Sequence, residues 1–161
     1  MENQGASLRL TDQKRHTYYM QAVSAASNKI INIWKGNNFD IQKELLFPND
    51  KPNNSPYSVD AYFVDDHILV EIDGSPYHKN IERDQIRDNH IEGIASSTGH
   101  DCYVIRLPLE IPQNLIYGNL QGKKRQEVKV KYNNWLENWA RVELASLPNR
   151  LRLAKLKNQV I

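Results

Sequence analysis

The sequence predicts an α/β protein in which one mixed sheet is flanked by helices. Helical and strand patterns follow one another in the order α-β-β-β-α-β, and further helical patterns come after them. The 161 residues are the length of one ordinary domain, and 40% apolar with 25% charged residues exclude collagen-like, coiled-coil and broadly disordered classes. We therefore expect a single domain over 1–161, with a core over about 11–107 and a basic helical extension over about 112–161.

The first element is predicted to be a helix over 11–35. Thr11 is a residue type that caps helix N-termini, and Gly36 is typical of a helix stop. Apolar residues recur along this segment at intervals of four and three, as expected for one buried helical face: Tyr19, Val23, Ala26, Ile30 and Ile33.

Three strands are predicted next, over 39–47, 58–64 and 67–74. The last two are rich in Val, Ile, Tyr and Phe, and Asp65 and Asp66 between them tolerate a tight turn. These two segments therefore predict a β-hairpin.

The remaining elements are a helix, a strand and a helical C-terminal part. The composition predicts a helix over 82–98 and a strand over 102–107. A longer helix is predicted over 124–146, and a short basic helix or arm over 149–157, separated from it by Pro148. The longer helix carries an apolar stripe made of Val128, Tyr132, Trp135, Trp139 and Val142.

Several protein classes are excluded by the apolar runs and by the cysteine count. No segment approaches the roughly 20 apolar residues that cross a bilayer, and residues 1–10 lack the apolar stretch of a signal peptide. Cys102 is the single cysteine, so neither an internal disulfide nor a zinc site of thiolates is available. We expect a cytoplasmic protein with no membrane partner.

The net charge of +2 hides an uneven distribution. Residues 121–161 hold ten Lys or Arg against three Glu, a net +7, which leaves −5 for residues 1–120. A basic C-terminal part indicates a surface for an anionic polymer such as nucleic acid, and the alternative is that the charges only solvate helix faces.

The predicted hairpin brings carboxylates together. A two-residue turn at Asp65 and Asp66, or a four-residue loop over 64–67, both place Glu71 directly opposite Asp60. Asp73, two residues further on, projects from the same face. Like charges so close repel one another, and a hard divalent cation such as Mg²⁺ between them would turn this repulsion into binding energy.

These residues resemble the PD-(D/E)XK nuclease superfamily, in the branch of the very-short-patch-repair endonucleases and similar small homing endonucleases. The resemblance covers about 39–107 and rests on VDAYFVDDHILVEIDGSPYH, ERDQIRD and CYVIRL. It implies a restriction-endonuclease-like fold in which Asp60, Glu71 and the main-chain carbonyl of Ile72 hold Mg²⁺, or alternatively Mn²⁺. His78 matches a histidine that the branch uses near the scissile phosphate.

The sequence departs from the family pattern at two places. Asp73 stands where the superfamily usually has a lysine, so we expect Asp73 to assist and His78 to act as general base or acid. The branch also tends to have a glutamate on the first helix, which is absent here. Gln21, Gln42 or Glu44 could replace it, and the sequence does not choose among them.

The resulting hypothesis is a Mg²⁺-dependent, sequence-specific DNA endonuclease that is a homing endonuclease or a restriction enzyme. A double-strand break would require a homodimer or homotetramer, because one such site cuts one strand. The alternative is a non-catalytic nucleic-acid-binding subunit, or a nuclease subunit of a larger complex. Seven cationic residues are candidates for contacts with double-stranded DNA: Arg83, Arg87, Lys123, Lys124, Arg125, Arg150 and Arg152.

Overall fold

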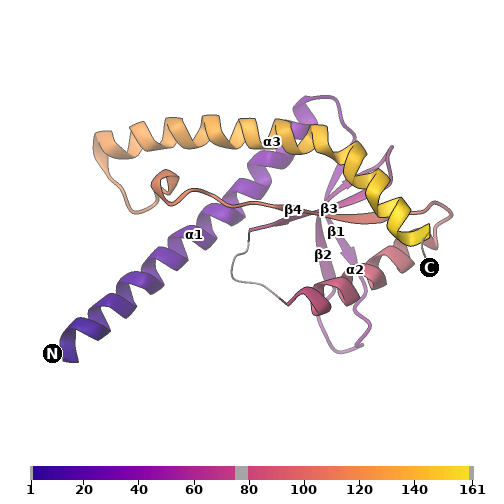
Figure 1. The fold of residues 1–161 in the computed structure, drawn as a ribbon, viewed down its shortest axis with the longest axis horizontal. Coiled ribbons are helices and arrows are strands. Elements are labelled where there is room, and N and C mark those ends of the chain that lie inside the picture. Colours follow the sequence, from indigo (N-terminus) through magenta and orange to yellow (C-terminus); the bar gives the residue numbers. More distant parts are fainter. Residues whose placement is uncertain (1, 75–79, 160–161) are drawn as a thin grey trace.

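The computed structural model describes the backbone of residues 2–74 and 80–159, and the side chains of 13–74 and 80–157. Four strands and three long helices follow the predicted order (Figure 1). The elements are α1 (Glu2–Gly36), β1 (Ile41–Phe47), β2 (Tyr57–Phe63), β3 (Ile68–Asp73), α2 (Ile81–Ser96), β4 (Tyr103–Pro108), the 3-10 turn η1 (Gln113–Leu115) and α3 (Gly122–Gln159).

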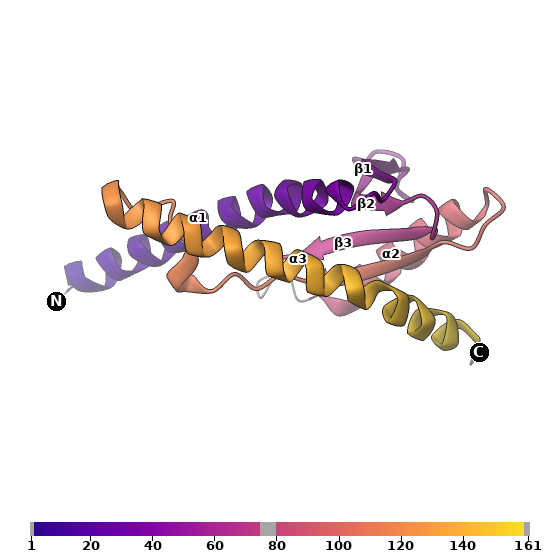
Figure 2. The ribbon, with the colours of Figure 1, turned by 90° about the horizontal axis from the view of Figure 1, so that it is seen from above.

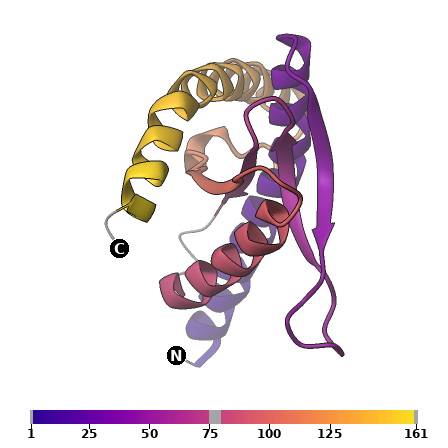
Figure 3. The same ribbon diagram turned by 90° about the vertical axis from the view of Figure 1, so that its right-hand side faces the viewer.

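The four strands form one mixed sheet in the order β1-β2-β3-β4. The first three strands are antiparallel neighbours, whereas β4 is parallel to β3 because α2 carries the chain back between them. Phe63 pairs with Ile68 across a four-residue loop, so the predicted hairpin and its register are confirmed. Figure 3 shows the β1–β2 hairpin on one side of the molecule and the C-terminal half of α3 on the other.

Helices cover both faces of the sheet, as predicted. The larger core cluster joins α1 and α3 to one face, where Ile30, Trp34 and Leu136 are among the most deeply buried side chains. A smaller cluster joins α2 to the opposite face through Ile91 and Leu69. Figure 1 shows α3 and α2 on opposite sides of β3 and β4, and Figure 2 shows α1 and α3 crossing. None of the described helices is both long and apolar enough to span a membrane.

The first helix begins nine residues before the predicted start. Thr11 therefore lies inside α1 and is not its N-cap. Residues 2–10 include Ala6, Leu8 and Leu10, which are good helix formers, and a single candidate cap residue does not outweigh them. Trp34 lies on the buried face of α1, and Ile33, predicted there, is only half-buried.

The C-terminal part differs from the prediction, because α3 continues through Pro148 as one helix. A proline inside a helix removes one main-chain hydrogen bond and costs about 3 kcal/mol. Side chains span this position: Arg150 binds Glu143 at 3.2 Å and Ser146 at 3.0 Å, and Leu147 is buried. Figure 1 shows α3 bending within its yellow C-terminal part.

The buried stripe of α3 also differs in part from the predicted one. Val128 and Tyr132 are buried as predicted, Trp135 and Trp139 are half-buried against the core, and Val142 is exposed. Four-residue steps from Val128 and Tyr132 continue the buried stripe to Leu136 and Ala140. Tyr132, Leu136 and Ala140 belong to the main core cluster, so α3 is part of the core as well as a basic surface element.

Gly74, at the end of β3, must be glycine because α1 packs directly on it. A Cβ atom at this position would overlap the side chain of Val23. We expect Gly74→Ala to lower the free energy of unfolding by about 1–3 kcal/mol, the usual cost of overpacking. Urea denaturation measures this loss. Val23→Ala in the same chain should recover part of it, and additive losses in the double variant would contradict this contact.

Candidate active site

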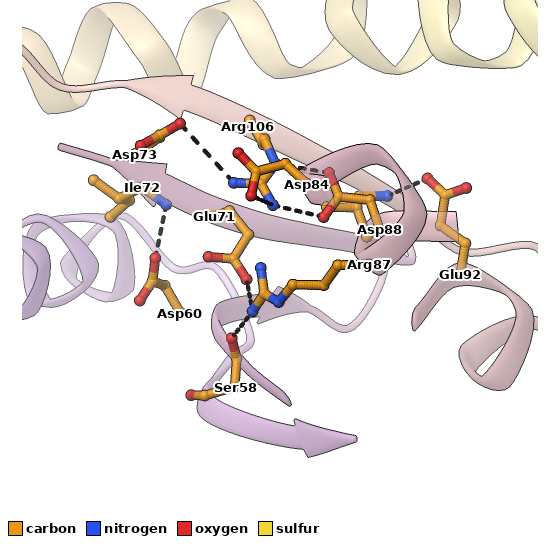
Figure 4. A network of polar contacts seen from close by, with 11 residues as sticks. Ser58, Asp60, Glu71, Ile72, Asp73, Asp84, Arg87, Asp88, Glu92 and Arg106 are labelled. Carbon is orange, nitrogen blue, oxygen red and sulfur yellow. Dashed lines mark hydrogen bonds and ion pairs between the residues drawn. The ribbon is translucent and has the colours of Figure 1, made fainter. Parts of the chain in front are cut away.

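Asp60 and Glu71 lie where β2 and β3 separate. The described pairing of these strands stops at Ala61 and Val70, one position short of the predicted Asp60–Glu71 pair. Beyond that point the carboxylate of Asp60 takes the place of a main-chain acceptor, and its Oδ2 accepts the N–H of Ile72 at 2.7 Å. The sheet thus opens beside two carboxylates, and Figure 4 shows both carboxyl groups on the same side of β3.

The carbonyl of Ile72 faces the same opening. In a strand, the N–H and C=O of one residue point to the same side, and the N–H of Ile72 points to Asp60. The neighbouring Asp73 points its main chain the other way, since its carbonyl accepts the N–H of Leu109 at 2.8 Å. Two carboxylates and one main-chain carbonyl therefore converge from β2 and β3.

Glu71 is buried and held by an arginine of α2. Its residue is 9% exposed, and its Oε1 accepts a hydrogen bond from the Arg87 guanidinium at 2.9 Å. The same guanidinium donates to the carbonyl of Ser58 at 2.6 Å and lies over the ring of Tyr57. Burial and, to a smaller extent, the charge of Asp60 raise the pKa of Glu71 to about 7, against the opposing effect of Arg87.

The carboxyl group of Asp60 is perturbed in the same direction. Burial raises its pKa, while the hydrogen bond from Ile72 and the charge of Arg87 act against this. Glu44 also raises the pKa of Asp60, so its charge acts on this site. It lies opposite Asp60 on β1, at a gap in the β1–β2 pairing, with a left-handed φ of 53°.

Of the three residues predicted to replace the missing helix glutamate, Glu44 is the one for which the described structure gives an electrostatic link to Asp60. Gln21 is exposed on α1, and Gln42 is exposed on β1 two residues before Glu44. A positive φ is uncommon for glutamate, and it redirects the chain locally.

Asp73 belongs to a second group of charges around Arg106 (Figure 4). Arg106, on β4, forms a bidentate ion pair with Asp88, with hydrogen bonds of 2.7 and 2.8 Å. Its guanidinium also lies 3.8 Å from the carboxylate of Asp84 and 3.9 Å from that of Asp73. Asp73 is on the same face as Glu71 but is directed toward Arg106. Arg106 is not among the predicted site residues, although a single cation within the apolar strand CYVIRL is a signal that it has a buried acidic partner.

A groove of about 1040 Å³ lies beside these groups, between the start of α2 and the loop before β2. Its lining includes Asp73, Arg87 and Arg106, so the ion pairs of the site form part of its wall. Lys51 and Arg83 add positive charge to the same lining, and three further acidic residues balance it: Asp50, Glu82 and Asp84. The groove is polar, and Arg87 connects it to the site, because Arg87 lines the groove and also binds the carboxylate of Glu71.

The predicted DNA-contacting cations do not form one surface. Arg83 and Arg87 lie on α2, whereas the other five lie on α3, against the opposite face of the sheet. Within α3, Arg125 and Arg150 are separated by about 38 Å, given 1.5 Å per helical residue. Arg150 pairs with Glu143, and Arg152 donates to Asn149, so both already have partners within α3.

His78 lies outside the described residues, and so its predicted role near the scissile phosphate stays a prediction. Among the residues that are described, no group of three or more His, Cys, Asp and Glu side chains is close enough to hold a metal ion. Asp60, Glu71 and the Ile72 carbonyl nevertheless suit Mg²⁺, which takes one or two carboxylates and completes its shell with water and phosphate oxygens. The donor set is all oxygen, which favours Mg²⁺ or Mn²⁺ over zinc.

Comparisons with protein-family models, curated proteins and solved structures find no match to this chain.

The raised pKa of Glu71 makes a prediction for stability. Between pH 4.5, the ordinary pKa of glutamate, and about 7, the folded chain holds a proton that the unfolded chain has released. The free energy of unfolding should therefore fall as pH rises through this range, by up to about 3 kcal/mol from this group. Urea denaturation at a series of pH values measures the slope. Glu71→Gln should flatten it, and equal slopes in both proteins would contradict the buried, protonated Glu71.

Proposed function

We propose that the protein is a metal-dependent DNA endonuclease. The observation that carries this proposal is the opening between β2 and β3, where Asp60, Glu71 and the Ile72 carbonyl converge beside a polar groove whose wall includes Arg83 and Arg87. A central mixed sheet flanked by helices is also the arrangement that the family resemblance implies. Metal-assisted hydrolysis of a phosphodiester uses oxygen ligands for a cation together with positive charge near the phosphate backbone.

Each residue of the site has a distinct role in this proposal. Asp60, Glu71 and the carbonyl of Ile72 hold Mg²⁺, with Mn²⁺ as the alternative. When bound, this ion activates water and stabilises the negative charge that develops on the phosphodiester. His78 moves the proton at the attacking water or the leaving oxygen, as the family resemblance implies.

Arg87 links the carboxylates to the groove. It neutralises Glu71 and also lines the groove, so it is placed to bind a phosphate of the cut strand as well. Arg106 holds Asp73, Asp84 and Asp88 together and so fixes α2 against β3 and β4. Its role is positioning, because the groove needs α2 at a fixed distance from the carboxylates.

The substrate in this proposal is double-stranded DNA bound along the groove, by Arg83, Arg87 and Lys51. Cations of α3 would contact DNA that bends around the domain, or a second duplex. A double-strand break needs two sites, so the active form is a homodimer or homotetramer. The biological role that fits best is that of a homing endonuclease or a restriction enzyme.

Supercoiled plasmid is the direct test of this activity. Purified protein should convert it to nicked and linear forms with Mg²⁺, and an excess of EDTA should stop the reaction. Rising salt should weaken binding steeply, because phosphate contacts release counterions. A protein that binds DNA but leaves several plasmids of different sequence intact with Mg²⁺ and with Mn²⁺ would overturn the proposal.

A second candidate is a non-catalytic DNA-binding subunit, or a nuclease subunit that acts only within a larger complex. The observation in its favour is the Arg87–Glu71 ion pair, which satisfies one carboxylate without a metal. Asp73 in place of the family lysine points the same way. Cleavage by the purified chain alone would exclude both forms of this candidate.

A further inference from the structure

A second cavity, of about 820 Å³, lies between α1, the η1 segment and the start of α3. Figure 1 shows α1 and α3 diverging toward their N-terminal parts, with the η1 segment between them. Its buried wall, which includes Tyr19 and Leu115, belongs to the core cluster on the α1–α3 face of the sheet. The candidate active site faces α2, so the two sites are separated by the sheet. The cavity has the size of a small-ligand pocket.

The described lining of this cavity carries positive charge and no carboxylate. Arg15 comes from α1, and Lys124 and Lys131 come from α3. The two lysines are seven residues apart, so they lie on the same face of the helix, on either side of Val128. No described carboxylate forms an ion pair with any of these three cations. Cations that surround a concave site without a counter-charge favour an anionic ligand.

The rest of the lining suits a flat ring with polar edges. Tyr18 supplies aromatic surface, and the backbone of Gly118 lies against its ring, where a Cβ would come within 3.1 Å. Amide side chains of Gln113, Asn114 and Asn119 supply donors and acceptors. Base rings are bound by aromatic surface and by such amides, and a simple carboxylate needs neither.

We propose that this cavity binds a nucleotide, with its phosphate at Arg15, Lys124 and Lys131 and its base between Tyr18 and the amides. The nucleotide is either free in solution or an unpaired unit of a nucleic-acid strand, since both present the same phosphate and ring. This inference does not depend on the nuclease proposal, because it uses neither Asp60 nor Glu71.

Isothermal titration calorimetry without metal tests the proposal on the full chain. Deoxyadenosine 5′-monophosphate should bind saturably, and Lys124→Gln and Lys131→Gln should each weaken it about tenfold, since each removes one charged contact to phosphate. Lys129→Gln is the matched control, because Lys129 is exposed on the same helix but does not line the cavity. Circular dichroism confirms that each variant is folded.

Four further ligands distinguish what the base, the phosphate and a longer strand each contribute to binding in the cavity. Deoxyadenosine and inorganic phosphate should each bind at least about tenfold more weakly than the nucleotide, because each lacks one half of it. A single-stranded tetranucleotide that binds more tightly than the mononucleotide identifies a strand as the source, and equal or weaker binding identifies a free nucleotide. Tighter binding of a tetraglutamate peptide, equal binding of inorganic phosphate, an equal loss in Lys129→Gln, or no saturable binding would each overturn the proposal.

Discussion

The Asp60→Asn variant is expected to lose at least about 10³-fold in the rate of Mg²⁺-dependent plasmid cleavage. Removing one carboxylate from a Mg²⁺ site forfeits several kcal/mol of transition-state stabilisation, and each 1.36 kcal/mol is a factor of ten in rate. The asparagine side-chain oxygen still accepts the N–H of Ile72, which Asp60 accepts at 2.7 Å in the wild type. The loss should therefore come from chemistry and not from folding.

Asp66→Asn is the matched control for this variant. Asp66 lies in the exposed loop of the same hairpin, so the substitution makes the same change of charge at a distance from the carboxylate pair. Its cleavage rate should equal that of the wild type. The proposed role of Asp60 would be contradicted if Asp60→Asn cleaved within about tenfold of the wild type, or if both variants lost activity equally.

The largest loss of stability is expected for Trp34→Ala. Trp34 is 0% exposed, its ring lies 5.6 Å from that of Phe63, and its Nε1 donates to the carbonyl of Ala140 at 2.8 Å. The side chain thus joins α1, the sheet and α3. Truncating a buried tryptophan costs about 3–5 kcal/mol, a large part of the 5–15 kcal/mol by which ordinary domains are stable.

Urea denaturation followed by circular dichroism measures this loss, and Trp139→Ala provides the comparison. Trp139 is half-buried at the margin of the same core cluster, so its truncation should cost clearly less. A loss below about 1 kcal/mol for Trp34→Ala would show that α3 does not depend on this contact. Losses of the same size in both variants would show that Trp34 has no special position in the core.

The parts of the fold that the sequence predicted best are those set by local pattern. The β2–β3 hairpin follows from two apolar strands and an Asp-Asp turn, and these alone define its register. The continuity of α3 could not be predicted in the same way. Pro148 strongly predicts a break in the helix. The burial of Leu147 and the contact of Arg150 with Glu143 stabilise the continuous helix instead, and both form only when the helix is folded.

The candidate site likewise has a part that local sequence pattern predicts and a part that only packing determines. Asp60 and Glu71 are neighbours because of hairpin register, so the sequence was sufficient to predict their approach. Arg87, which binds Glu71, and Arg106, which binds Asp88, come from α2 and β4, and only the packing of these elements on the sheet decides which carboxylate each arginine meets. Local periodicity contains no information on such long-range pairs, although it does place Arg87 on a helix.

The proposed activity depends on a divalent cation bound between Asp60 and Glu71. Titration calorimetry with Mg²⁺ at pH 8, in the presence of a short DNA duplex, measures this binding, since Glu71, whose pKa is about 7, is then mostly ionised. We predict saturable uptake of Mg²⁺ by the wild type and its loss in Asp60→Asn. The proposed binding would be contradicted by a wild-type protein that binds the duplex yet takes up neither Mg²⁺ nor Mn²⁺, or by undiminished uptake in Asp60→Asn.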